Sequence, residues 1–386
     1  MNNYKELSQC LLLTLFAGLS LSSQAREMQP LLEYGAFGET YKLVQELEPE
    51  GYRAQMLATY YTFVGRQDLV YDIEEMLPLP DKCLEDGDPS LSSAEHWAET
   101  AFNDYKIVMI NENHFHLASR VWLLGMLESF KDQGFTHIGF ESFAPGDKYP
   151  DEGFYTHEPT FAAMVERAHD LGFEVFGYES TKEVPEGASA LEVREQTQAQ
   201  NIADTIDDAD SDSRFLIFAG WGHIAKYPVG DDEQLWMAAR FMQLTDIEPY
   251  SIDLVSCVYH ASQVARPERG KVMLDSEGAP ILKGRFGPLV DAQLHLPTIS
   301  GETKSTGFYR QALGEAVSIP ESLRHTEETR LVRAFKESRS DSIVPYDQVL
   351  LFAGENYPLY LGSGHTYELI SVDEKGEIQS RETINL

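Results

Sequence analysis

The segment at residues 106–116, KIVMINENHFH, begins as a buried strand and ends in a group of polar side chains. Residues 107–110 are all apolar, and a short apolar run of this kind indicates a strand inside a sheet. A carboxylate and two imidazoles follow at once, as Glu112, His114 and His116. In open α/β sheets, ligands bind beyond the carboxyl ends of the strands. The segment therefore predicts a core strand that ends at a functional site.

Strands and helices alternate through residues 93–262. After the first strand, further strands are expected at 136–142, 173–180, 214–223 and 248–255. Helices with an apolar face are expected between them, at 117–132, 159–172, 188–209 and 231–244. Strands separated by helices of this length pair in parallel through crossovers. The sequence therefore predicts an α/β fold, with a mainly parallel sheet covered by helices on both faces.

Two regions flank this α/β core. Residues 26–92 are expected to form an N-terminal helical segment and an acidic linker, because apolar positions recur at threes and fours up to residue 78. Residues 263–386 are expected to be irregular at first and then β-rich. Few clear elements are expected at 265–305, whereas residues 348–384 alternate in the strand period.

The first 25 residues have the features of a signal peptide, which predicts a periplasmic or secreted protein. Lys5 precedes an apolar stretch from Leu11 to Leu21, and small residues for cleavage follow it. No later segment is apolar for long enough to span a membrane. The cysteines left after cleavage, Cys83 and Cys257, either form a disulfide in an oxidising compartment or are two separate buried thiols.

The charge of the chain limits the class of partner. Its 63 acidic and 30 basic residues give a formal net charge of -33. A surface this acidic repels phosphate backbones, so nucleic acid is excluded as a partner. The expected partner is a small-molecule substrate, and no membrane span is expected.

Ionisable or aromatic side chains follow three further strands of the expected sheet. Glu141 and Glu179 come after the second and third strands, and Trp221 and His223 come after the fourth. Two histidines and two carboxylates can hold a divalent metal that activates water. Without a metal, a glutamate of raised pKa can take a proton from water while a histidine serves as acid or base. Both alternatives stay open at this point.

One segment next to these strand ends is rich in Tyr, Pro and Gly. Residues 144–159, APGDKYPDEGFYTHEP, follow Glu141 directly. They form either a lid over the strand ends or a plain surface loop.

The order of these motifs resembles the superfamily of erythromycin esterase-like and ChaN-like proteins, which includes the TIKI-type hydrolases. The similarity covers residues 95–250. It rests on NENH (111–114), GFES (139–142), REQTQAQNI (194–202) and LIFAGWGHIAK (216–226). The residues that match the motifs of this superfamily are Glu112, His114, Glu141, Arg194, Glu195, Ala199, Asn201 and His223.

The chain also departs from the pattern of the superfamily. Asn111 stands where the first motif usually has glycine, and Gln198 replaces the usual methionine of the helix motif. A second histidine often found further along has no counterpart, since Ser119 lies near that place. His116 is the candidate substitute.

The resemblance implies two functions in competition. The first is an exported hydrolase for an ester or amide, with or without a metal. In that case Glu112 or Glu141 is the base, His114 and His223 are acid partners, and all four are candidate metal ligands. Glu179, Arg194, Trp221 and His116 are then candidate substrate-binding residues. The second is a haem- or iron-binding protein, with His114 or Tyr178 as an axial ligand. A scaffold that works through its N-terminal helices is a third possibility.

Overall fold

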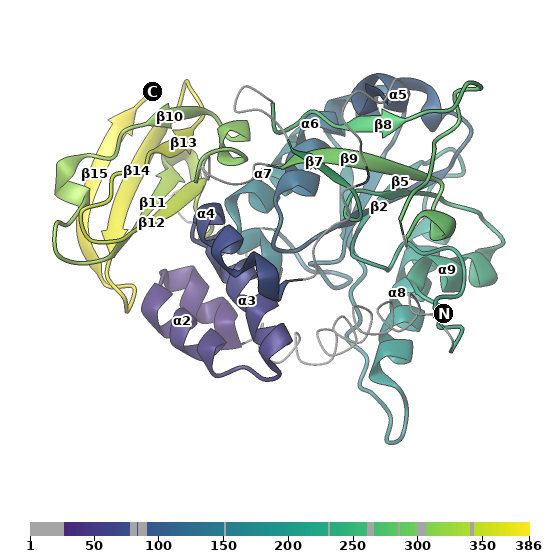
Figure 1. The fold of residues 1–386 in the computed structure, drawn as a ribbon, viewed down its shortest axis with the longest axis horizontal. Helices are drawn as coiled ribbons and strands as arrows, with labels where there is room; N and C mark the ends of the chain where they lie inside the picture. The colour runs from purple at the N-terminus through teal and green to yellow at the C-terminus, as the bar shows by residue number, and fades with distance from the viewer. Residues whose placement is uncertain are drawn as a thin grey trace.

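The computed structural model describes residues 27–77, 83, 91–149, 152–230, 232–260, 266–284, 286–298, 306–339 and 343–386. Three parts are visible in Figure 1: N-terminal helices, an α/β core and a C-terminal β-rich unit. The expected signal peptide at residues 1–25 lies outside the described residues. Within the described ranges, no helix is both long enough and apolar enough to cross a membrane.

The α/β core is built on a sheet of nine strands in its described part. Its central path is parallel and runs in the order β9 (Ala292–Thr298), β6 (Tyr250–Asp253), β2 (Ile107–Glu112), β5 (Phe215–Gly220), β3 (His137–Phe140) and β4 (Glu174–Gly177). At one end β8 (Lys271–Met273) and β1 (Leu91–Ser93) add antiparallel strands, and β7 (Val258–His260) pairs with β9. The mainly parallel α/β fold expected from the sequence is confirmed.

Both faces of the sheet are covered because the central strands are apolar on both sides. In β2, Val108 and Ile110 belong to one core cluster, while Ile107 and Met109 belong to the other. The first cluster is shared with α5 (Ala94–Ala101), α6 (Ala118–Asp132) and α7 (Pro159–Asp170). The second is shared with α8 (Ala190–Asp208) and α9 (Met237–Thr245). Successive side chains of a strand point to opposite faces, so one apolar run supplies both cores.

The N-terminal segment is helical, as expected. Residues 27–34 are followed by α2 (Phe37–Gln45), α3 (Glu50–Phe63), α4 (Gln67–Val70) and the 3₁₀ helix η1 (Tyr71–Met76). These helices lie beside the C-terminal unit in Figure 1. Buried Arg66 joins the two parts, since its guanidinium contacts Asp68 and Glu355, each at 2.8 Å.

The C-terminal unit has a core of its own. Four antiparallel strands follow the order β12 (Asp347–Leu351), β11 (Arg330–Lys336), β14 (Thr366–Val372) and β15 (Ile378–Asn385). Beside them, β10 (Glu315–Val317) pairs with β13 (Leu359–Leu361). Short 3₁₀ helices connect the strands of the chain: η2 (Phe154–His157), η3 (Gly287–Leu289), η5 (Arg310–Ala312), η6 (Glu321–Leu323) and η7 (Glu337–Arg339).

The central sheet continues past residue 262, into a segment where the sequence predicts few elements. Strand β9 is fully buried, although it carries Gln293 and His295 and contains Pro297. Gln293 is accommodated because its side-chain amide donates to Oδ2 of Asp253 at 3.0 Å. Because of these residues, the sequence of β9 lacks the apolar pattern that indicates a buried strand. Helix α9 also begins later than expected, at Met237, because Val229 and Gln234 pair in an isolated bridge.

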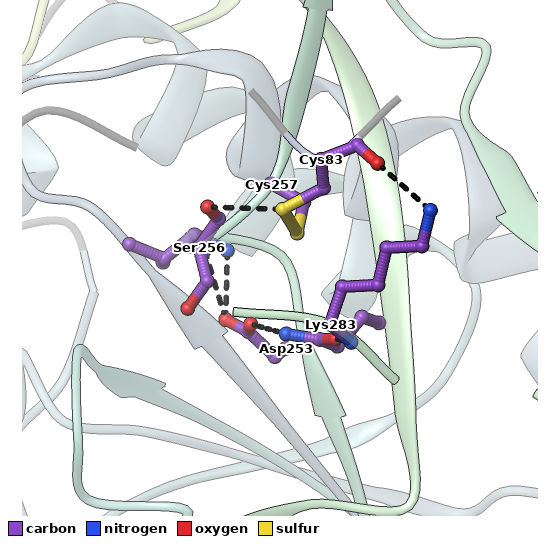
Figure 2. Close-up of a disulfide and its surroundings, with 7 residues drawn as sticks. Cys83, Asp253, Ser256, Cys257 and Lys283 are labelled. Atoms are coloured by element: carbon purple, nitrogen blue, oxygen red, sulfur yellow. Dashed lines mark hydrogen bonds between the residues drawn. A yellow bond between two sulfur atoms is a disulfide. The ribbon is translucent and has the colours of Figure 1, made fainter. Parts of the chain in front are cut away.

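Cys83 and Cys257 form a disulfide, the first of the two alternatives left open by the sequence (Figure 2). Nζ of Lys283 donates to the carbonyl oxygen of Cys83 at 3.3 Å. Asp253, at the end of β6, accepts a hydrogen bond from the backbone N–H of Ser256 at 3.2 Å. The disulfide therefore lies just beyond the carboxyl end of a core strand.

Candidate functional site

The carboxyl ends of four neighbouring parallel strands bring the expected ionisable residues together. Glu112 is the last residue of β2 and pairs in register with Gly220, the last residue of β5. Glu141 directly follows β3, and Glu179 follows β4 by two residues. The strand ends lie at a common rim, as expected, and their side chains form two adjoining groups of one cluster. Glu141, Glu179 and His223 are joined through Arg194, and Glu112 with His114 lies next to them across Gly220.

Glu112 is a buried carboxylate held by two donors. Arg120 donates to it through Nε at 2.6 Å and through a terminal nitrogen at 3.0 Å. Nδ1 of His114 lies 2.8 Å from Oε1 of Glu112. Burial alone would raise the pKa of Glu112, but the guanidinium charge and the bond to His114 lower it below its usual value. Glu112 is therefore ionised at neutral pH.

Arg120 connects Glu112 to a second buried acid, Glu158. The other terminal nitrogen of Arg120 contacts Glu158 at 3.1 Å, and both side chains are almost fully buried. Glu158 also accepts the backbone N–H groups of Thr160 and Phe161, each at 2.8 Å, as the N-cap of α7. This network ties the start of α6 to the start of α7 behind the site. Neither Arg120 nor Glu158 is predicted by the strand-end pattern.

His114 lies between an aromatic ring and a backbone. Its imidazole stacks on Tyr155 of η2, with ring centroids 4.5 Å apart and an interplanar angle of 15°. On Gly220, an added Cβ would lie 2.5 Å from Nε2 of His114 and 3.1 Å from Oε2 of Glu141. A side chain at position 220 would collide with the imidazole, so only glycine lets the ring lie this close to the strand end.

Glu141 has both oxygens occupied. One accepts the backbone N–H of Gly220, and the other contacts Arg194 and Nε2 of His223. Burial would raise its pKa, but the positive charges of His223 and Arg194 hold the pKa of this carboxyl well below its usual range. Glu141 is therefore a fixed anion of the site.

His223 faces a carboxylate on each side. Its Nε2 lies 3.2 Å from Glu141, and its Nδ1 lies 2.9 Å from Glu195 of α8. Burial opposes the charge, but the two acids together raise the pKa of His223 to about 10. As an imidazolium it donates from both nitrogens. The 3.3 Å approach of Arg194 to Nε2 is therefore a contact between two cations that share Glu141.

Arg194 completes the cluster from the first turns of α8. Its Nε lies 3.0 Å from Oε1 of Glu179, which also accepts from Gln198 at 3.2 Å. Asn201, one more turn along the helix, donates to the backbone carbonyl of Tyr178 at 3.0 Å. The helix motif REQTQAQNI thus faces the strand ends with Arg194, Glu195, Gln198 and Asn201.

The cluster reaches solvent at one side. The side chain of Glu179 is 28% exposed, Arg194 19% and His114 16%, whereas Arg120, Glu112 and Glu158 are almost fully buried. A molecule from solvent thus meets His114 and the Arg194–Glu179 pair first.

Two expected binding residues point elsewhere. Nε2 of His116 lies 3.1 Å from the hydroxyl of Tyr309, and burial lowers the pKa of His116 to about 4. The indole of Trp221 packs against Phe115 and the N-terminal helices, with ring centroids 5.8 Å apart. His116 and Trp221 are thus built into the contacts between the core and its neighbours.

The four residues expected to bind a metal are not arranged as a metal site. In the part of the chain that the structure describes, no group of three or more His, Cys, Asp or Glu side chains is arranged to hold a metal ion. The oxygens of Glu112 and Glu141 are taken up by arginines, histidines and a backbone amide. The assignment of Glu112, Glu141, His114 and His223 as metal ligands is therefore corrected.

Tyr178, one of the two expected axial ligands of haem, is not available to bind iron. The hydroxyl of Tyr178 is fully buried and donates to the carbonyl oxygen of Phe218 at 2.7 Å, so it is committed to the protein backbone. Tyr178 therefore lacks the open side that an axial ligand of haem needs. His114, the other expected axial ligand, is partly exposed, and its Nε2 edge lies near Gly220.

No protein-family model and no curated protein matches the chain. Among solved structures it is similar to RRSP, a MARTX toxin effector domain from Vibrio vulnificus, at 12% identity and a TM-score of 0.33, over 53% of this chain and 46% of that one. It is also similar to the type III effector HopBA1, at 11% identity and a TM-score of 0.33, over 55% of this chain and 100% of that one. It is similar as well to the C-terminal region of Pasteurella multocida toxin, at 10% identity and a TM-score of 0.31, over 89% of this chain and 57% of that one. The chain spans less than half the length of the RRSP structure, and similarity at this level carries no functional argument.

Proposed function

We propose that the protein is an exported hydrolase of the erythromycin esterase-like and ChaN-like type, which cleaves an ester or amide in a small molecule. The observation that carries the proposal is the Glu112–His114 pair at the carboxyl end of β2, with Nδ1 and Oε1 2.8 Å apart. An ionised carboxylate only accepts hydrogen bonds, so Nδ1 carries the proton of the imidazole and Nε2 is its basic nitrogen. His114 is thereby prepared to act as a general base.

In the proposed reaction, Nε2 of His114 takes a proton from a water molecule while the water oxygen forms a bond to the carbonyl carbon of the substrate. The proton then passes to the leaving oxygen or nitrogen as its bond to that carbon breaks. Glu112 keeps its charge throughout and stabilises the imidazolium that forms on His114, as the acid does in triads of the Ser-His-Asp kind.

The glutamates have a different role in this reaction from the one expected from the sequence. Glu112 and Glu141 were the expected bases, but the pKa of each is lowered and their oxygens are occupied. A carboxylate of low pKa is a weak base. Glu112 therefore positions His114, and Glu141 holds Arg194 and His223 in place.

Export is supported by two observations on the chain. The first 25 residues resemble a signal peptide, and Cys83 is paired with Cys257. Disulfides form and persist in the periplasm and outside the cell, and they are rare in a reducing cytosol.

The test is a hydrolysis screen of the purified protein after dialysis against EDTA. The probes are p-nitrophenyl esters of increasing chain length and amino-acid p-nitroanilides. We expect turnover of at least one probe, and a loss of about 100-fold or more in kcat in His114→Gln, the scale of general base catalysis. The exposed His96 supplies the matched control, His96→Gln, which keeps wild-type kcat. Full activity in His114→Gln overturns the proposal.

A further inference from the structure

Tyr155 is the aromatic neighbour of the proposed base, and the strand-end pattern does not single it out. It lies in residues 144–159, the segment expected to be either a lid or a plain loop. Its ring is stacked on His114 at 4.5 Å, so the imidazole is held between Tyr155 and the backbone of Gly220. A ring held on one face by Tyr155 and at its edge by Gly220 keeps Nε2 of His114 in one place.

The backbone of Tyr155 is itself fixed. Its N–H donates to Oγ of Ser142 at 3.0 Å, and its carbonyl accepts the N–H of Glu158 at 3.0 Å. The guanidinium carbon of Arg120 lies 5.3 Å from the centre of the tyrosine ring. Tyr155 is thus joined to the same network that holds Glu112. A catalytic group must be held in position before the substrate binds, and these contacts hold Tyr155 in this way.

The hydroxyl of Tyr155 differs from the other donors near the site. Arg194 and His223 already contact carboxylates, and the hydroxyl of Tyr178 donates to a backbone carbonyl. In the described part of the chain, the backbone N–H of Tyr155 donates to Ser142 but its hydroxyl donates to no protein group, and the hydroxyl is not among the fully buried polar atoms that lack a partner. Burial, followed by the charges of Glu141 and Glu112, raises its pKa well above the usual value. The hydroxyl therefore keeps its proton at any pH at which the protein works.

We propose that Tyr155 is a further catalytic residue of this site, whose hydroxyl donates a hydrogen bond to the carbonyl oxygen of the bound ester or amide while its ring holds the imidazole of His114. The proposal rests on the hydrolase function proposed above. As water attacks, negative charge develops on the carbonyl oxygen, and the hydroxyl stabilises that charge without giving up its proton. The ring of Tyr155 thus orients the base, and its hydroxyl stabilises the negative charge that forms on the carbonyl oxygen.

Two substitutions separate these roles. Tyr155→Phe keeps the ring stacked on His114 and removes only the hydroxyl. Tyr155→Leu removes both the ring and the hydroxyl. Tyr367→Phe is the matched control, because Tyr367 is also buried and its hydroxyl donates to a backbone carbonyl, that of Gly362, in the C-terminal unit. Near-ultraviolet circular dichroism and thermal unfolding check that each variant is folded.

The experiment measures kcat, KM and the pH–rate profile on the p-nitrophenyl ester that the wild type hydrolyses fastest. We expect Tyr155→Phe to lower kcat about 100-fold with KM within a few-fold, the effect of removing one oxyanion donor. Tyr155→Leu should lower kcat further and shift the acidic limb of the profile, which a purely structural role would not do. Tyr367→Phe should keep wild-type kcat.

Each other outcome has a distinct meaning. Wild-type kcat in a folded Tyr155→Phe, together with an inactive His114→Gln, overturns the role of Tyr155 and leaves the hydrolase proposal standing. Full activity in His114→Gln overturns the hydrolase proposal itself. The absence of any turnover by the wild type overturns both.

Discussion

The imidazole of His223 lies between two buried carboxylates, with its Nε2 3.2 Å from Oε1 of Glu141 and its Nδ1 2.9 Å from Oε1 of Glu195. This relationship joins the end of β3 to helix α8 through a residue that follows β5. It charges the histidine at neutral pH, because two anions outweigh the cost of burial. The charge of His223 is therefore part of what holds the site together.

The charge of His223 makes the stability of the protein depend on pH. Its pKa is about 10 in the folded chain, above the value of roughly 6.5 in an unfolded one. The stabilisation is thus fully present below about pH 6.5 and is lost as the pH rises through about 10. We expect His223→Gln to lower the free energy of unfolding by about 3 kcal/mol at pH 6, and by less at pH 10.

Urea unfolding at pH 6, 8 and 10 measures this dependence. The exposed variant His96→Gln is the control and should differ little from the wild type at each pH. A deficit in His223→Gln that grows with pH would contradict the assignment of His223 as an imidazolium.

The close approach of His114 to Gly220 predicts a strong effect of a single methyl group. In Gly220→Ala the added carbon meets Cε1 and Nε2 of His114 at 2.5 Å, and the ring is not free to move aside because Tyr155 covers one of its faces and Nδ1 is bound to Glu112. We expect a loss of about 1–3 kcal/mol in stability, typical of overpacking, and a loss of hydrolysis. Gly222→Ala is the control in the same turn, since its nearest neighbours are atoms of Trp236 at 3.7 Å. Equal effects of Gly220→Ala and Gly222→Ala on stability and hydrolysis would contradict the close approach of His114 to Gly220.

The buried Arg120 should be far more important for stability than an exposed arginine between the same two helices. Arg120→Met leaves Glu112 and Glu158 buried without their cation, which costs about 3–5 kcal/mol. Arg167 of α7 pairs with Glu128 of α6 at 3.0 Å in an exposed position, so Arg167→Met should cost at most about 1 kcal/mol. Chemical denaturation of both variants measures the difference, and similar losses would refute the buried network.

The disulfide predicts a reductant-sensitive protein. The bond between Cys83 and Cys257 closes a loop across a sequence separation of 174 residues, which stabilises the fold by about 5 kcal/mol on the chain-entropy account. We expect the double variant Cys83→Ser/Cys257→Ser to unfold at a lower temperature than the wild type. Dithiothreitol should lower the Tm of the wild type and leave that of the double variant unchanged. A wild-type Tm that does not respond to complete reduction would contradict this expectation.

Much of the site could be predicted from the sequence because the carboxyl ends of parallel strands lie at the same edge of the sheet. Glu112, Glu141, Glu179 and His223 all follow expected strands. Arg194 joins Glu141, Glu179 and His223, whereas Glu112 is held by Arg120 and His114. His116 and Trp221 follow the same pattern but face Tyr309 and Phe115. A strand-end position fixes where a residue lies, but the direction of its side chain depends on neighbours from other parts of the chain.

The residues that the sequence did not reveal are those that act through distant partners. Arg120 lies in an apolar helix, and a basic residue flanked by buried apolar positions was the one available signal. Glu195 matches the helix motif of the superfamily, but its complete burial against His223 was not expected. Tyr155 and Glu158 come from an irregular segment without periodicity. Strand β9 was missed for a related reason, because its polar side chain Gln293 is satisfied by Asp253 rather than by solvent.

The most direct test of the account is the protonation state of His114 and His223. Protein labelled with ¹⁵N-histidine, with the two resonances assigned from His114→Gln and His223→Gln, reports the state of each ring nitrogen in long-range ¹H–¹⁵N spectra at pH 8. We predict that neutral His114 carries its proton on Nδ1, facing Glu112, and that His223 is protonated on both nitrogens. A proton on Nε2 of neutral His114, or a neutral His223, would contradict the account.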